Sequence, residues 1–357
     1  MQERMILKKN MIIQYCRKNT LYGSEDHLVW KSENHGLDWQ ELCRLPPQKH
    51  DIIARCRDYL LRSRPVRRWR RNIGINNVVV LPTGTAVIQY DRIYRYDGHG
   101  NRAQPVFDLQ QAGVDGPLKN GLCYDHASNS LYFGEYRCRR AGPVRIFRGR
   151  DDGRTWSECY RFSPNRIRHI HSITSDPYSG RLYVCTGDAD HECGLFYTDD
   201  EFRTLHCLGS GDQGWRMVSL LPVGGELVWG SDAGGDTPPG TDNFIYHCNP
   251  KTGKRTRLAK VENPVYFSCR TKNGYWLATG FEPHKQGSSS PQFGLWFSAN
   301  GLDWQPSRHF HYQNGFTGTG SRYGLVYLPG GRSDRLHASP VNCRNFHFST
   351  ISIDPPQ

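Results

Sequence analysis

Four segments of this chain share one turn signature, and this repetition constrains the fold more than any other sequence feature. Each segment follows a short apolar run and places an Asp or Asn two residues after its first residue. They span residues 32–39, 149–156, 198–205 and 298–304. Asp151, Asp200 and Asn300 recur at multiples of roughly 50 residues, a period typical of β-propellers and other repeat folds. The sequence therefore predicts an array of similar β units.

The residues of the signature suit a tight hairpin between two strands. The Asp or Asn side chain can accept hydrogen bonds from backbone N–H groups of the turn. A glycine such as Gly153 supplies the positive φ that the turn requires. A tryptophan such as Trp156 buries a large ring, which we expect to lie between neighbouring sheets. Only the segment 149–156 carries the signature almost complete.

Short alternating strands fill the intervals between these turns, as in NNVVVLPTG, RLYVCTG and YWLATG. The 37 glycines and the 12% of aromatic residues also favour strands and turns over helices. We therefore predict an all-β fold, a single β-propeller domain spanning residues 1–357 with about seven four-stranded blades. Radial closure would remove the exposed sheet edges. A β-sandwich or two β domains are the alternatives.

One interruption, at residues 46–75, separates the first predicted blade from the second. Its apolar residues have helical spacing. From Lys49 to Arg71 it holds nine basic and two acidic residues, more than half of the net charge of +12. We expect an amphipathic helix and a basic arm that contacts an anionic membrane surface or acidic polymer. A solvated helix is the alternative. We expect no nucleic-acid binding, since no recognised nucleic-acid fold accompanies the run.

The four turns resemble the Asp-box, or BNR repeat, of sialidase-like β-propellers. This resemblance implies that the turns lie on one face, that a binding site lies on the other, and that the ligand is a carbohydrate. An acidic residue follows the second strand of five predicted blades: Asp91, Glu135, Asp188, Asp232 and Glu282. The resemblance places these carboxylates around the mouth of the central channel. The structural alternative is that each carboxylate caps a turn.

Candidate site residues gather between the third and fifth predicted blades. We predict catalytic roles for Glu135, Tyr136, His171 and Asp188, and substrate binding by Asn120, Trp215, Arg216 and Asp232. The indole of Trp215 could stack on a sugar while Arg216 grips a carboxylate. We expect His169 and His171 to face opposite sides of their strand, so that they cannot chelate one metal ion. No metal or other cofactor is predicted. A structural polar plug is the alternative for the whole cluster.

Three functions remain open for an acidic-glycan partner. The first is a glycoside hydrolase using Asp188 or Glu135 as acid or base. The second is a polysaccharide lyase with His171 as base, Tyr136 as acid and Arg216 neutralising a uronic acid. The third is a non-catalytic glycan-binding or scaffold protein. The Phe/Tyr-Arg-Ile-Pro motif of sialidases is missing, so the sugar and its linkage are not named.

Twelve cysteines without any Cys-x-x-Cys pair argue against zinc ribbons and redox motifs. The N-terminus does not resemble a secretory signal, because charges interrupt its short apolar stretches. We therefore expect reduced thiols, a cytoplasmic location and a monomer.

Overall fold

The computed structural model describes residues 6–46, 56, 60, 74–137, 142–283, 291–313 and 322–356. In the stretches longer than one residue, helix is limited to two 3-10 turns, η2 (Asp190–Glu192) and η3 (Gln213–Trp215). The rest of the regular structure is β-strand, as predicted. The described helices include none that is long and apolar enough to cross a membrane.

Five sheets are four-stranded, and in four of them the strands pair in chain order. The first contains β6 (Asn77–Val80), β7 (Ala86–Gln89), β8 (Ile93–Tyr96) and β9 (Gln104–Phe107). The second contains β10 (Leu122–Asp125), β11 (Ser130–Gly134), β12 (Arg145–Arg150) and β13 (Thr155–Arg161). The third contains β14 (His169–Ser175), β15 (Leu182–Gly187), β16 (Gly194–Thr198) and β17 (His206–Ser210). The fourth contains β18 (Leu221–Val223), β19 (Glu226–Gly230), β20 (Asn243–Cys248) and β21 (Arg255–Val261).

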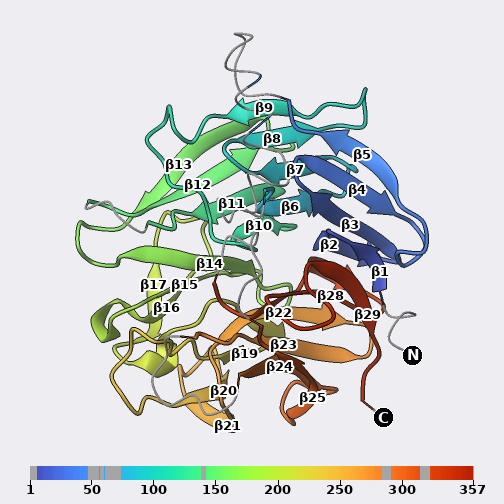
Figure 1. The fold of residues 1–357 in the computed structure, drawn as a ribbon. Coiled ribbons are helices and arrows are strands. Elements are labelled where there is room, and N and C mark those ends of the chain that lie inside the picture. Colours follow the sequence, from blue (N-terminus) through green and yellow to red (C-terminus); the bar gives the residue numbers. More distant parts are fainter. Residues whose placement is uncertain are drawn as a thin grey trace.

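The fifth four-stranded sheet joins the two ends of the chain. It pairs β26 (Leu325–Tyr327), β28 (Leu336–Val341), β29 (Ser349–Ile353) and β1 (Ile6–Lys9), in that order. Figure 1 shows the sheets arranged around a common centre, with β6, β10, β14 and β22 near it and β9, β13 and β21 toward the outside. This arrangement is a β-propeller.

The sixth sheet has nine strands, and it corrects the prediction of seven separate blades. One half contains β22 (Val265–Thr271), β23 (Gly274–Thr279), β24 (Gln292–Ser298) and β25 (Gln305–His311). The other half contains β2 (Ile12–Lys18), β3 (Thr20–Glu25), β4 (Leu28–Ser32) and β5 (Gln40–Arg44). The short strand β27 (Gly330–Ser333) pairs in parallel with both β22 and β2 and so joins the halves. Five separate blades are therefore present, beside one composite sheet.

Two kinds of hydrogen bond recur among the four sequence turns, each at three of them. The backbone N–H groups of Asp38, Thr204 and Asp303 each donate to the side-chain oxygen of the turn Asn or Asp, at 2.9 Å in all three cases. At three of the turns the indole Nε1 of the tryptophan donates to the glycine carbonyl, also at 2.9 Å. The side chains thus satisfy backbone groups that a tight hairpin leaves unpaired.

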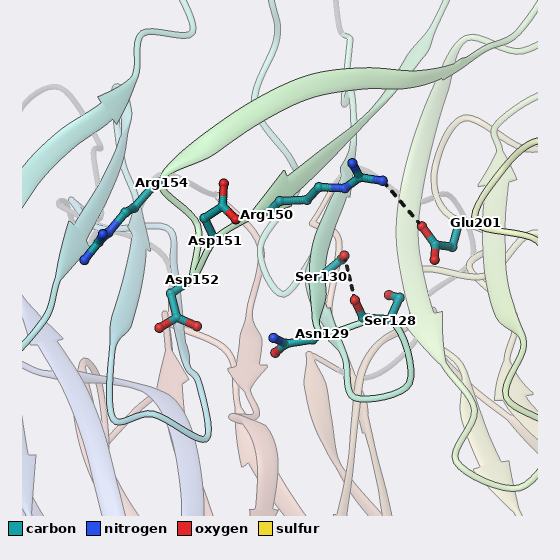
Figure 2. Close-up of a pocket in the computed structure, with 8 residues that line it drawn as sticks. All are labelled: Ser128, Asn129, Ser130, Arg150, Asp151, Asp152, Arg154 and Glu201. Atoms are coloured by element: carbon teal, nitrogen blue, oxygen red, sulfur yellow. Dashed lines mark hydrogen bonds and ion pairs between the residues drawn. The ribbon is translucent and has the colours of Figure 1, made fainter.

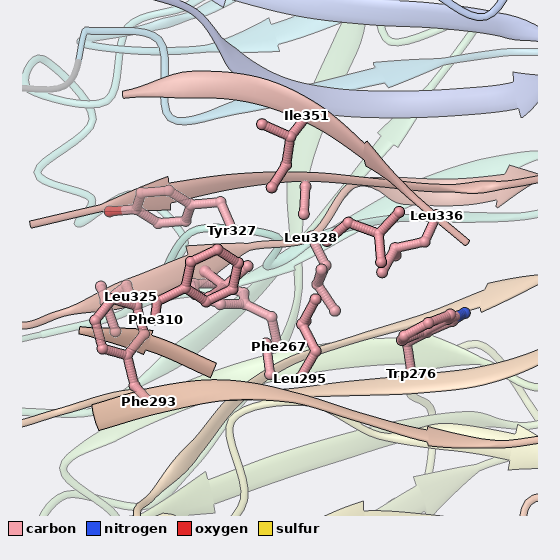
Figure 3. Packing of buried hydrophobic residues seen from close by; sticks show 14 of the residues in the cluster. Phe267, Trp276, Phe293, Leu295, Phe310, Leu325, Tyr327, Leu328, Leu336 and Ile351 are labelled. Carbon is pink, nitrogen blue, oxygen red and sulfur yellow. The ribbon is translucent and has the colours of Figure 1, made fainter. Parts of the chain in front are cut away.

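Apolar side chains fill the spaces between neighbouring sheets rather than one central core. In Figure 3 the largest described cluster packs Phe267 and Trp276 of one sheet against Leu336 and Ile351 of the next. Inner strands such as β6 and β15 are buried along their whole length, whereas the outer strand β13 is mostly exposed. The buried inner strands therefore hold in place the polar side chains at their ends, around the centre of the propeller.

The predicted helical and basic insertion at 46–75 lies outside the described residues, apart from Pro46, Gly74, Ile75 and two isolated positions. Those two, Cys56 and Leu60, are both exposed.

Candidate functional site

The candidate site lies at the end of the strands opposite the four turns. His169, at the start of β14, is paired with Gly187, at the end of β15. Asp188 follows directly, whereas the turn around Asp200 joins the other ends of β16 and β17. The antiparallel pairing therefore separates the turn and the carboxylate by the length of the blade, in agreement with the sequence prediction.

His169 and His171 face the same space, which contradicts the prediction that they point apart. Side chains two residues apart in a strand lie on the same face, because the pleat repeats every two residues. A register shift between Ile170 and Ser172 leaves His171 without a partner in β15, as in a β-bulge. The two Nε2 atoms lie 3.1 Å apart, and both residues are 2% exposed.

Backbone carbonyls fix the orientation of both imidazoles. The Nδ1 atom of His169 lies 3.1 Å from the carbonyl oxygen of Arg137, and that of His171 lies 2.9 Å from the carbonyl oxygen of Met217. Because a carbonyl oxygen only accepts, both Nδ1 atoms must donate. The Nε2 atoms then face Asp188, whose Oδ1 lies 3.3 and 3.5 Å away. In the described part of the chain, these three residues form a group that could hold a metal ion.

Tyr136 and Arg168 border this group. The ring of Tyr136 stacks on His169, with centroids 4.2 Å apart and planes at 28°, and lies 6.2 Å from the ring of His171. Arg168 donates from Nη1 to Asp188 Oδ2 at 2.9 Å, and half of its side chain is exposed. A phenol, two imidazoles and a carboxylate therefore meet beside an accessible guanidinium.

Arg216 links this group to the next blade. Its Nη2 lies 3.3 Å from Asp188 Oδ1, and its Nε lies 3.3 Å from Asp232 Oδ2. Two hydrogen bonds of 3.0 Å join it to Asp236, a residue that the sequence analysis missed. Three carboxylates thus surround a guanidinium that is 5% exposed. The prediction has Arg216 grip a substrate carboxylate, whereas in the structure its Nη1 and Nη2 atoms face protein carboxylates.

Burial and neighbouring charges shift the protonation equilibria of the cluster. Burial, together with the charges of Glu282, Asp236 and Asp188, raises the pKa of Asp232 to about 8 although Arg216 opposes this shift. Burial also opposes ionisation of Asp188, but hydrogen bonds and charges from the two imidazoles outweigh it and lower its pKa. Burial lowers the pKa of His171 and so favours its neutral form.

A second buried pair lies on the adjoining blade. Tyr266, at the start of β22, donates a very short hydrogen bond to Glu282, whose other oxygen accepts from the N–H of Gly235 at 2.6 Å. Burial raises the pKa of Tyr266 well above its usual value, and the charges of Asp232 and Glu282 add to this. Glu282 therefore belongs to the predicted acidic rim, beside Asp188 and Asp232.

Four predicted residues lie apart from the cluster. Glu135 is fully buried and binds Arg145, with 2.8 Å between Oε1 and Nη2. Trp215 has no exposed face for a sugar, because it stacks on Trp229 at 5.3 Å and has Arg255 over its ring. The remaining two are engaged elsewhere. Asn120 donates to the Leu328 carbonyl at 2.7 Å and lines a different cavity of about 250 Å³, and Asp91 accepts from Tyr94.

A larger hollow, of about 570 Å³, lies at the turn end of the propeller. Figure 2 shows it between Asp151, Asp152 and Arg154 of one turn and Ser128 and Glu201. Arg150 approaches Glu201 across it at 3.9 Å. Its lining contains no imidazole, phenol or thiol, so we assign the chemistry to the opposite end.

No known protein family matches this sequence, and no curated protein matches it either. Solved structures do resemble the fold. An oligogalacturonate lyase in complex with manganese has a TM-score of 0.58 and 12% identity, with 98% of this chain and 90% of that one covered. The Niastella koreensis GH74 enzyme gives 0.55 and 14%, and the Xanthomonas campestris GH74 xyloglucanase 0.54 and 14%; each match covers 85% of this chain and 46% of the other. These likenesses support a β-propeller, but not specifically the sialidase-like kind.

Proposed function

We propose that this protein cleaves an acidic glycan at the cluster of Tyr136, His169, His171 and Asp188. The observation that carries the proposal is the meeting of a phenol, two imidazoles and a carboxylate at the end of the hub that lacks the turns. A site that holds both proton donors and proton acceptors is the minimum for acid–base cleavage of a glycosidic bond. Similar propellers that are named as a lyase and as a xyloglucanase support the choice of a glycan.

Elimination suits this geometry better than hydrolysis by two carboxylates. A hydrolase needs two carboxyl groups on either side of the bond. Here Asp232 is 5% exposed and Arg216 stands between it and Asp188, so a sugar cannot lie between the two. In elimination, a base removes the proton next to the uronic carboxylate, a C=C bond forms, and the C–O bond to the leaving sugar breaks. Tyr136 is suited to protonate the leaving oxygen, and Arg168 to attract the substrate carboxylate.

The four turns also support a proposal about ancestry. Their shared hydrogen bonds are those that an Asp-box requires, and we infer from them that the chain is an Asp-box propeller with a diverged site.

The test is incubation of the full chain with a panel of uronic-acid polysaccharides. Elimination should release products with ultraviolet absorbance together with new reducing ends, whereas hydrolysis gives reducing ends alone. Tyr136→Phe should lower turnover at least about 100-fold. The control is Tyr178→Phe, an exposed tyrosine between β14 and β15 at the turn end, which should match wild type. No cleavage of any polysaccharide, or full activity of Tyr136→Phe, contradicts the proposal.

A further inference from the structure

Three possible ligand atoms for a metal ion, His169 Nε2, His171 Nε2 and Asp188 Oδ1, converge at the candidate site. The Nδ1 atoms of His169 and His171 donate to backbone carbonyls, so Nε2 is the atom of each ring that is available to a metal ion. The two Nε2 atoms and Asp188 Oδ1 lie within 3.1 to 3.5 Å of one another. Acceptors at this distance repel each other in a buried site unless a positive charge lies between them.

We propose that His169, His171 and Asp188 bind a first-row divalent metal ion such as Zn²⁺. Imidazole and carboxylate ligands together favour such ions over Mg²⁺ and Ca²⁺, which prefer oxygen alone. With ligand distances of about 2.1 Å, the observed separations correspond to angles of about 95° to 115° at the ion, close to tetrahedral geometry.

The surrounding contacts suit a metal site. Both imidazoles are held through Nδ1 by carbonyl oxygens, as metal-binding histidines usually are. Arg168 occupies Asp188 Oδ2 and leaves Oδ1 directed at the imidazoles. Arg216 also approaches Oδ1, but Asp236 offsets its charge through two hydrogen bonds. Three protein ligands leave a further position for water or substrate, as in catalytic rather than structural zinc sites.

Metal binding goes beyond the proposed function and is measured without any glycan. With the ion bound, both imidazoles are ligands, so Tyr136 carries both proton transfers: its ionised phenol oxygen takes the proton next to the carboxylate and returns it to the leaving oxygen. The two proposals can therefore fail separately. Tyr136→Phe should keep the metal and lose cleavage, whereas Asp188→Asn should lose the metal.

The test uses the full chain, stripped with a chelator and titrated with Zn²⁺ by calorimetry. We expect one ion per chain, and affinity at least about 100-fold weaker in Asp188→Asn and His171→Gln. The matched control is the double variant His309→Gln and His311→Gln. It removes a second His-x-His pair, which is exposed on β25 and should contribute nothing.

Three outcomes overturn the proposal: no zinc uptake, uptake that the double control abolishes, or unchanged affinity in Asp188→Asn. If a ligand variant fails to fold, X-ray absorption of zinc-loaded wild type decides instead. It should show two imidazoles bound to the ion at about 2.0 Å. A spectrum without imidazole scattering counts against the site. In each case Mg²⁺ should not compete.

Discussion

The two His-x-His segments of this protein have the same spacing and opposite environments. His169 and His171 lie on β14, next to the hub, where both rings are buried and contact Asp188. His309 and His311 lie on β25, the edge strand of the nine-stranded sheet, and both are exposed. Spacing alone puts each pair on one face of its strand. The position of the strand within the blade decides whether that face meets ligands or water.

The largest expected effect separates an inner ion pair from an outer one. Arg216→Ala should lower the free energy of unfolding by about 3–5 kcal/mol, because it leaves buried carboxylates uncompensated. Arg161→Ala removes an exposed pair with Glu158 on the outer strand β13 and should change little. Urea unfolding measures both. Equal losses of unfolding free energy would mean that the position of an ion pair within the blade does not determine its contribution to stability.

The second-largest expected difference in stability is between the two histidine pairs. In metal-free protein, His171→Ala leaves the Met217 carbonyl unpaired and opens a cavity, so we expect a loss of about 1–3 kcal/mol. His311→Ala should stay within about 0.5 kcal/mol of wild type, like other surface changes. Chemical denaturation after chelation tests this. An unchanged stability of His171→Ala would show that the metal-free site tolerates the loss of this ring.

Asp232 should make the inner site sensitive to pH. Its pKa of about 8 in the folded state lies above the usual 3.8, so it stays protonated when the unfolded chain ionises. Stability due to this group is present below pH 4 and is lost as the pH rises to 8, by up to about 1.4 kcal/mol per pH unit. The charged and titratable groups around it are Arg216, Glu282, Asp236, Asp188 and Tyr266.

The difference between wild type and Asp232→Asn isolates that contribution. Stability curves from pH 4 to 9 should be flatter in the variant, and parallel curves would contradict the assignment.

The smallest effect belongs to a turn carboxylate at the opposite end, and it has the opposite sign. Hydrogen bonds from the backbone N–H and hydroxyl of Thr204 lower the pKa of Asp200 to about 2. Its stabilising contribution is therefore present above pH 4 and is lost as the pH falls toward 2. Thermal unfolding between pH 2 and 5 should show a shallower decline in Asp200→Asn than in wild type. An identical decline in both proteins would show that Asp200 does not contribute to the acid sensitivity of the fold.

The turns and most strands could be predicted because their signals are local. Asp200 and Thr204 are four residues apart, and the hydrogen bonds between them follow from the turn alone. Asp188, His171 and Arg216 could be brought together because His171 and Asp188 lie at the same end of one blade and Arg216 enters the next blade at that end.

Other long-range contacts could not be predicted. Nothing near Gly330 indicates that β27 pairs in parallel with two distant strands. Asp236 stands in a Gly- and Pro-rich loop, and only the folded chain directs it at Arg216. The burial of Trp215 against Trp229 likewise depends on a strand fourteen residues further along.

The pairing of β1 with β29 sets an order on biosynthesis. Ile6 pairs with Ile351 and Lys9 with Ser349, so β1 cannot pair in this way until β29, far along the chain, has been synthesised. Until then β1 has an unpaired edge, and such edges can recruit strands of other chains. Full closure of the ring therefore waits until β29 has been synthesised, and loss of either β1 or β29 would leave an unpaired edge on the strand that remains.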